Sequence, residues 1–155
     1  MEKQKIIDLI ITFAVWFVVS LPIHEFWHYQ VGSWLGGKGF YVTYPNFLSG
    51  FCAWPTPFSH MWIAYIAGGL GTAIVMFLLA WRAMLSPTKW DEDEVFSLAV
   101  LGGLEVGYGL SELSILYAPG IFNYIAPICS ILGALPFMIW RGPKMVDWIM
   151  KEEVS

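Results

Sequence analysis

Four long apolar stretches constrain this chain more than any other feature of its sequence. They run over roughly 6–35, 60–82, 95–117 and 121–140. A helix needs about 20 residues to cross a bilayer, and each stretch supplies that length. Because 57% of the 155 residues are hydrophobic and only 13% are charged, polar side chains are too few to coat a water-soluble globule. We therefore predict an all-α multi-pass membrane protein with four transmembrane helices, folded as a single domain over 1–155 and embedded in the lipid bilayer.

The segment between the first two stretches has a different composition. It runs from Lys38 to Trp54, and its β-branched and aromatic residues flank the turn dipeptide Pro45-Asn46. This pattern is typical of a small β-hairpin. Since an unpaired strand edge is costly in lipid, we expect the hairpin to lie at the membrane interface or against protein.

The basic residues predict the orientation of the chain, because Lys and Arg near membrane spans stay on the cytoplasmic side. If the amino terminus is cytoplasmic, only Lys38 of the 8 basic residues lies outside. The others then share the cytoplasmic side: Lys3, Lys5, Arg82, Lys89, Arg141, Lys144 and Lys151. We therefore expect both termini in the cytoplasm. The net charge of −4 and the lack of a basic stripe argue against nucleic-acid binding.

An H-E-x-x-H motif lies near the far end of the first apolar stretch, at His24-Glu25-Phe26-Trp27-His28. Residues four apart share one face of a helix, so the two imidazoles can bind one zinc ion. Zinc lowers the pKa of a bound water, and the adjacent carboxylate can accept its proton and pass it to a leaving amine. The motif predicts His24 and His28 as zinc ligands, Glu25 as general base and amide hydrolysis as the reaction.

A structural role for these histidines is the competing interpretation, since membrane histidines often lie at headgroup level or hydrogen-bond across helices. The chain has only 3 histidines, and this spacing with glutamate in second place arises by chance in roughly a few sequences per thousand. A carboxylate inside a membrane also needs a partner such as a metal ion. We therefore favour a metal site.

Two histidines and a water leave zinc one protein ligand short. The third apolar stretch supplies two candidates, Glu105 and Glu112, which lie nearly on one helix face. From the start of that stretch, Glu105 lies about 15 Å and Glu112 about 26 Å along the helix, whereas the two histidines lie about 27 to 33 Å along theirs. We assign Glu112 as the third ligand. Glu105 is expected to support a ligand or line the substrate path, and a hydrogen bond to a neighbouring helix is an equal alternative.

His60 is a rival third ligand. It begins the second apolar stretch at its outer face, next to Trp62. Polar and aromatic side chains gather at the membrane interface, so an interfacial role is favoured. Glycines in the second and third stretches, including a G-x-x-x-G at Gly103 and Gly107, indicate close helix packing.

The order of these motifs resembles the site-2 protease family of intramembrane zinc metalloproteases, over about residues 6–116. Besides the H-E-x-x-H helix and the glycine-bounded β-segment, residues 67–72 read A-G-G-L-G-T where such enzymes commonly have A-G-P-x-x-N. Gly69 therefore stands at the place of the proline and Thr72 at that of the asparagine. The family's last ligand is an aspartate in an L-D-G context, and Glu112 in Leu110-Ser111-Glu112-Leu113 is the nearest counterpart, without the glycine.

The resemblance implies a three-helix core that holds one zinc per chain and cleaves the transmembrane segment of a membrane-protein substrate. The substrate helix must unwind, and the edge of the predicted hairpin could then hold it extended by strand addition. Thr72 takes the place of the amide as a weak donor to the oxyanion. Familiar members place zinc nearer the cytosol, whereas the basic residues here place His24 and His28 towards the outer face.

Three other functions compete with a protease. The first is a catalytically degenerate relative that binds metal or a partner protein, which the departures at Gly69 and Thr72 favour. A haem-carrying subunit ranks low, because two histidines four apart on one helix cannot bind opposite faces of one haem. A transporter with Glu105 and Glu112 along an ion path is also conceivable, although no broken helix or inverted repeat is visible.

Overall fold

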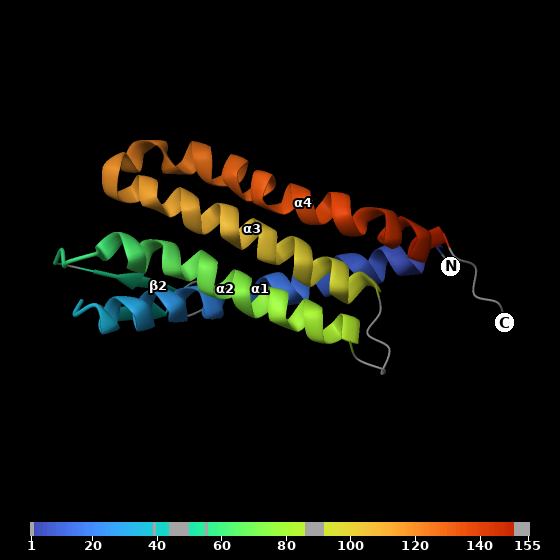
Figure 1. Cartoon of the computed structure of the whole chain (residues 1–155), viewed down its shortest axis with the longest axis horizontal. Coiled ribbons are helices and arrows are strands. Elements are labelled where there is room, and N and C mark those ends of the chain that lie inside the picture. Colours follow the sequence, from blue (N-terminus) through green and yellow to red (C-terminus); the bar gives the residue numbers. More distant parts are fainter. Residues whose placement is uncertain (1, 39, 44–49, 55, 86–91, 151–155) are drawn as a thin grey trace.

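The computed structural model describes residues 2–38, 40–43, 50–54, 56–85 and 92–150. Its four long helices are α1 (Glu2–Trp34), α2 (Met61–Leu85), α3 (Glu92–Tyr117) and α4 (Phe122–Met150), and a single turn, η1 (Pro119–Ile121), joins α3 to α4 (Figure 1). Within these ranges, 4 helical segments are long and apolar enough to cross a membrane. The predicted architecture of four helices of membrane-spanning length is therefore confirmed.

The observed α4 is longer than its predicted span, which was expected to end at residue 140. The helix continues to Met150 through Pro143, and prolines are tolerated in membrane helices where neighbouring groups satisfy the freed backbone. Arg141 does not mark the end of the helix, because its side chain is buried and Nη2 forms an ion pair of 2.6 Å with Glu92 Oε1 of α3. Further along, Lys5 of α1 donates a hydrogen bond of 3.0 Å to the carbonyl of Trp148.

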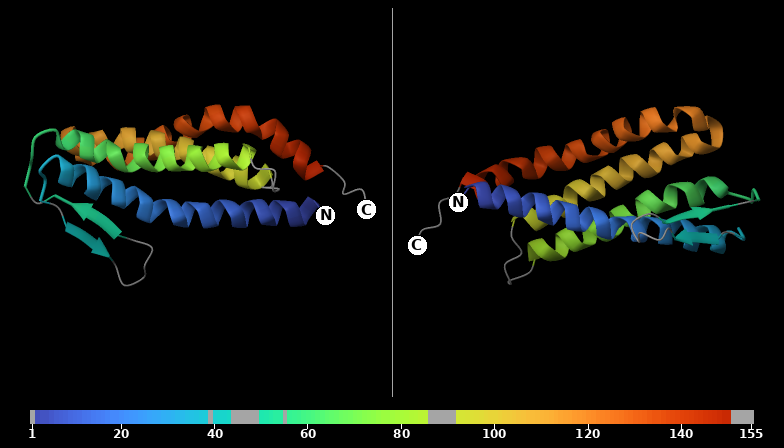
Figure 2. Two further views of the ribbon diagram at one scale, coloured as in Figure 1. Left: turned by 60° about the horizontal axis from the view of Figure 1, so that its bottom comes forward. Right: turned by 180° about the vertical axis from the view of Figure 1, so that it is seen from behind.

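Helix α3 lies at the centre of the bundle, where it packs against α2, α4 and α1 (Figures 1 and 2). Glycines allow the closest approaches. A Cβ on Gly109 of α3 would lie 2.9 Å from the Cα of Gly69 on α2, and one on Gly103 would lie 2.5 Å from the carbonyl oxygen of Gly133 on α4. The predicted close packing is thus observed on both sides of α3.

Two short strands lie in the segment between α1 and α2. Strand β1 (Phe40–Thr43) pairs antiparallel with β2 (Gly50–Ala53), so that Phe40 faces Ala53 in the register. Both strands contact α1, and Figure 2 shows them alongside its carboxyl-terminal part. The predicted turn at Pro45-Asn46 lies outside the described residues.

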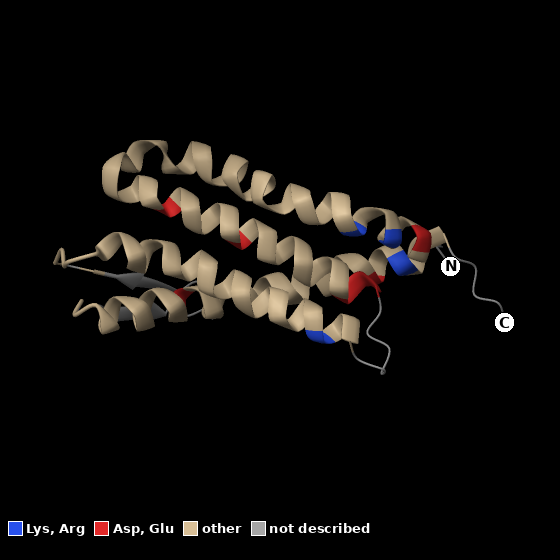
Figure 3. Ribbon diagram, viewed as in Figure 1, with Lys and Arg blue, Asp and Glu red and all other residues tan. Residues whose placement is uncertain are grey.

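The bundle has two chemically different ends. Helix α1 begins where α4 ends (Figure 1), and the basic residues of the helices gather at this end (Figure 3), which we call the basic end. They are Lys3 and Lys5 in α1, Arg82 in α2, and Arg141 and Lys144 in α4. A chain with four spans brings its two ends to the same side of a membrane. The assignment of that side to the cytoplasm stays a prediction.

Candidate metal centre

The two histidines of the motif lie one turn apart on α1, on the face that packs against α2 and α3. Both are buried, with relative exposures of 6% for His24 and 7% for His28. Their Nε2 atoms lie 2.9 Å apart, and the rings meet edge to face with centroids 4.6 Å apart. The helical spacing that the motif predicts therefore brings one nitrogen of each ring to the same point.

Glu112 of α3 reaches the same point from across the bundle. Its Oε1 atom lies 3.3 Å from His24 Nε2 and 3.2 Å from His28 Nε2, and its side chain is as buried as the histidines. The structure thus brings together the three predicted ligands, which we call the ligand cluster: His24, His28 and Glu112.

The other nitrogen of each imidazole has its own partner. His28 Nδ1 lies 2.7 Å from the carbonyl oxygen of Ala64 on α2, and His24 Nδ1 lies 2.8 Å from Glu105 Oε2 on α3. Carbonyl and carboxylate oxygens only accept hydrogen bonds, so both Nδ1 atoms donate. A histidine that binds a metal is neutral and carries a single N–H, so with Nδ1 as the donor each Nε2 would present a lone pair to the ion. Two lone pairs and a carboxylate oxygen therefore converge, and a cation between them would satisfy all three.

The spacing of these atoms fits a metal ion. In a tetrahedral site with bonds of about 2.05 Å, ligand atoms lie about 3.3 Å from one another, and the three distances in the ligand cluster are 2.9, 3.2 and 3.3 Å. Glu112 Oε2 is also buried and has no hydrogen-bond partner among the described residues. Two imidazoles and a carboxylate suit zinc and other divalent transition metals.

Glycine at position 68 lets α2 pass directly over the ligand cluster. A Cβ at Gly68 would lie 2.7 Å from His24 Nε2 and would overlap the ring of His28. Any other residue would therefore push α2 away or rotate the imidazoles. This role goes beyond the general close packing that the glycines predict.

The remaining predicted site residues occupy three different environments. Glu25 is half-buried beside the cluster, since ligand atoms of His24, Glu25 and His28 all lie within 4.8 Å of one another. Thr72 is fully buried, and its hydroxyl donates a hydrogen bond of 2.8 Å to the carbonyl of Gly68 on its own helix. His60, the rival ligand, is exposed just before α2.

Glu105 lies closer to the cluster than its depth along α3 predicts. We expected it to lie at a different level from the histidines, but its Oε2 atom contacts His24 Nδ1. The contact agrees with the expected role of Glu105 in supporting a ligand: Glu105 and Glu112 approach opposite nitrogens of one imidazole ring, and their long side chains span the two turns between them. Glu105 is also hydrogen-bonded to a neighbouring helix, as the alternative interpretation stated.

Tyr108 is a site residue that the sequence analysis missed. It lies on α3 between the two glutamates, and its ring packs edge to face against His24 with centroids 5.4 Å apart. The available signal was its position three residues after Glu105 and four before Glu112, which places all three on one helix face.

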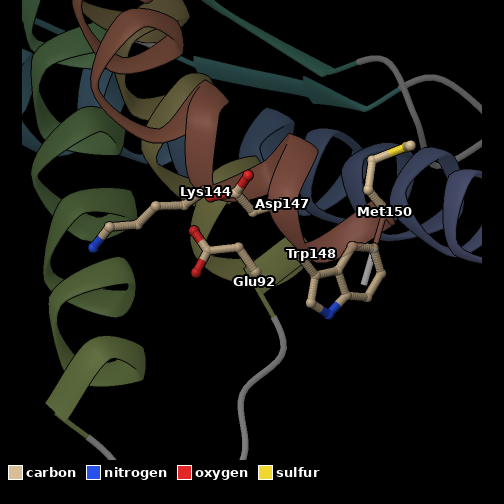
Figure 4. Close-up of a pocket in the computed structure, with 5 residues that line it drawn as sticks. All are labelled: Glu92, Lys144, Asp147, Trp148 and Met150. Carbon is tan, nitrogen blue, oxygen red and sulfur yellow. The ribbon is translucent and has the colours of Figure 1, made fainter. Parts of the chain in front are cut away.

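A cavity lies elsewhere, at the basic end. Its volume is about 520 Å³, and the residues that line it are Glu92, Lys144, Asp147, Trp148 and Met150 (Figure 4). By the helical rise, Glu92 lies about 30 Å along α3 from Glu112. The cavity is therefore separate from the ligand cluster and contributes nothing to it.

Comparison with protein-family models, with curated proteins and with solved structures gave no match. The functional argument therefore depends on the geometry of the site.

Proposed function

We propose that this protein is an intramembrane zinc metalloendopeptidase, similar to the site-2 proteases, which hydrolyses peptide bonds in or near transmembrane segments of membrane proteins. One observation carries the proposal. His24 Nε2, His28 Nε2 and Glu112 Oε1 converge within 3.3 Å of one another, on helices of membrane-spanning length and beside the carboxylate of Glu25. Three ligands from two helices form a site with one position left for water or substrate.

Zinc and Glu25 would have separate roles in hydrolysis. Zinc, when bound, supplies a Lewis acid that activates water and polarises the substrate carbonyl. Glu25 takes a proton from the water, whose oxygen bonds to the carbonyl carbon. The C–N bond then breaks, and Glu25 gives the proton to the departing nitrogen. One water is consumed, and a carboxylic acid and an amine are formed, between which the second water proton passes to give a carboxylate and an ammonium group.

Two further groups keep the imidazoles in a binding orientation. Glu105 accepts a hydrogen bond from His24 Nδ1, and the carbonyl of Ala64 accepts one from His28 Nδ1. Each bond fixes the ring with its Nε2 lone pair directed into the cluster. Such partners of metal-bound histidines typically raise metal affinity by about 10- to 100-fold.

The surroundings of the cluster support a membrane-protein substrate. The cluster is carried by helices that are apolar and long enough to cross a membrane, and the strands β1 and β2 contact the helix that carries both histidines. A substrate helix has its carbonyls internally bonded and must unwind before cleavage. The outer edge of this two-stranded sheet offers backbone groups that could hold the unwound segment extended. With the basic end in the cytoplasm, the cluster lies in the outer half of the bilayer.

A metal-binding protein of the same fold without peptidase activity is the alternative. The hydrogen bond from Thr72 to Gly68 favours it, because a hydroxyl engaged with its own helix cannot at the same time donate to an oxyanion. One zinc per chain without cleavage of any membrane peptide would support this alternative.

A Glu25→Gln variant tests the proposal. Purified protein in phosphatidylcholine liposomes is incubated with a panel of fluorescently labelled single-span peptides that carry a central helix-breaking Asn-Pro pair. We expect Glu25→Gln to lower the cleavage rate about 10³-fold, since it removes the base, while zinc content is unchanged. Asp147→Asn, an exposed acid at the basic end, is the matched control and should cleave normally. Equal cleavage by the wild type and Glu25→Gln would exclude the mechanism.

A further inference from the structure

Tyr108 occupies a distinctive place at the edge of the ligand cluster. Its ring packs edge to face against His24 on one side and against Phe122 of α4 on the other, with centroids 5.4 and 5.7 Å apart. Tyr108 is 36% exposed, whereas His24 and Glu112 are each only 6% exposed. Tyr108 therefore lies at the boundary between the buried cluster and the membrane-facing surface, where a substrate backbone would approach.

Tyr108 shares one face of α3 with both glutamates of the site, three residues after Glu105 and four before Glu112. Its ring contacts His24, a proposed ligand and the chain neighbour of the proposed base Glu25. The side chain therefore stands beside the residues that act on the peptide bond. A tyrosine O–H is a neutral donor, and it supplies a hydrogen bond without adding a charge that competes with a metal.

Hydrolysis of a peptide bond needs such a donor. As the water oxygen bonds to the carbonyl carbon, an electron pair moves onto the carbonyl oxygen, and catalysis depends on groups that stabilise this charge. Thr72 stands where the site-2 protease family has its amide, but its hydroxyl is fully buried and donates to Gly68. The Thr72 hydroxyl is therefore not available to the carbonyl oxygen of a substrate in this arrangement.

We infer that Tyr108 is a further catalytic residue, whose hydroxyl donates a hydrogen bond to the carbonyl oxygen of the scissile peptide bond. This inference rests on the proposed function. Tyr108 keeps its proton throughout. When the electron pair returns to the carbonyl carbon, the C–N bond breaks and the amine leaves with the proton that Glu25 delivers. The ring contacts with His24 and Phe122 fix the side chain, so the donor is oriented before the substrate arrives.

A Tyr108→Phe variant tests the inference, because it removes the hydroxyl and keeps both ring contacts. In the liposome assay with the labelled Asn-Pro peptides, we expect kcat to fall about 100-fold with KM changed less than about threefold, as for loss of one oxyanion donor. Zinc content should stay at the wild-type value. Tyr117→Phe is the matched control on the same helix, since Tyr117 is 79% exposed at the end of α3, and its kcat should not change.

The possible outcomes separate this inference from the proposed function. If Tyr108→Phe cleaves at the wild-type rate while Glu25→Gln is inactive, Tyr108 has no catalytic role and the protease proposal stands. If Tyr108→Phe loses zinc, its role is structural, and the inference is overturned. If the wild type cleaves no better than Glu25→Gln, both proposals fail together.

Discussion

The basic end and the ligand cluster both bury polar groups but pair them in opposite ways. At the basic end, donors meet acceptors: Arg141 pairs with Glu92 at 2.6 Å, and the Thr12 hydroxyl donates to Asp93 Oδ2 at 2.8 Å. In the ligand cluster, Glu112 meets two imidazole nitrogens, and the opposite nitrogen of each ring already has an acceptor of its own, Glu105 or the Ala64 carbonyl. Complementary pairs at the basic end hold α3 against its neighbours, whereas the convergence of acceptors calls for a cation.

Burial alone does not distinguish a structural ion pair from a metal site. Arg141 and Asp93 at the basic end are each 5% exposed, and His24 and Glu112 in the cluster are each 6% exposed. The two regions differ in the hydrogen-bond partners that surround each buried side chain. In the cluster, Glu105 and the Ala64 carbonyl bind the Nδ1 atoms of the two histidines. The Nε2 atoms are therefore the ones directed at Glu112 and at a metal ion. Changes at the two ends should therefore affect different properties of the protein.

The largest effect is expected from Gly68→Ala. The added methyl group would overlap the His28 ring and crowd His24 Nε2, so one imidazole must rotate away. Overpacking of this kind costs about 3 kcal/mol, which corresponds to roughly 100-fold weaker zinc binding. Competition with a fluorescent zinc chelator in detergent measures it. Gly142→Ala on α4 is the control, because its Cβ meets nothing within 4 Å. Equal zinc affinity in both variants would show that a small residue at position 68 is not needed for the imidazoles to bind zinc.

Arg141→Met at the basic end is expected to have an intermediate effect, on the stability of the protein and not on its zinc binding. The substitution leaves the Glu92 carboxylate without its cation, and Glu92 is only partly buried, so the cost is on the order of 2 kcal/mol of stability. Thermal unfolding in detergent should show a lower Tm, with zinc content unchanged. Adding Glu92→Gln should recover most of the loss. A variant that lost zinc as well would show that the two ends are not independent.

A smaller effect is expected from Glu105→Gln. The amide oxygen can still accept from His24 Nδ1, but without the negative charge that strengthens the bond. We expect zinc affinity to fall about tenfold, within the usual range for partners of metal-bound histidines. The chelator assay used for Gly68→Ala measures this change, and Asp147→Asn again serves as the charge-matched control. Unaltered affinity would show that the negative charge of Glu105 does not strengthen zinc binding by His24.

The sequence predicted the local part of the site and the helices that carry it. Helical spacing alone brings His24 and His28 together, and the apolar stretches locate the four helices to within a few residues, except at the end of α4. That end was missed because the partner of Arg141 is Glu92, which lies on another helix. Depth along α3 selected Glu112 as the ligand and left Glu105 to support one, but it did not predict that both side chains reach the same imidazole ring. Rise per residue does not describe where a long side chain reaches.

Contacts between helices account for the rest of what the sequence could not show. Tyr108 shares a helix face with both glutamates, but only the crossing of α1 and α3 places its ring on His24. Likewise, the spacing of glycines predicts close packing, but it does not identify Gly68 as the one that clears the imidazoles. The hydrogen bond from Thr72 to Gly68 is an arrangement that threonine commonly adopts inside a helix, but the sequence does not select between the two rotamers that threonine uses there.

The most direct test of the central claim is the zinc content of the purified wild type and of Glu112→Ala, both dialysed against zinc in detergent. A background with Cys52→Ser and Cys129→Ser removes both cysteine thiols of the chain as competing ligands. We predict one zinc per chain in the wild type, with zinc-edge X-ray absorption showing two imidazole nitrogens at about 2.0 Å, and at least a 100-fold loss of affinity in Glu112→Ala. A wild type that binds no zinc, or a Glu112→Ala variant that binds it equally well, would contradict the account.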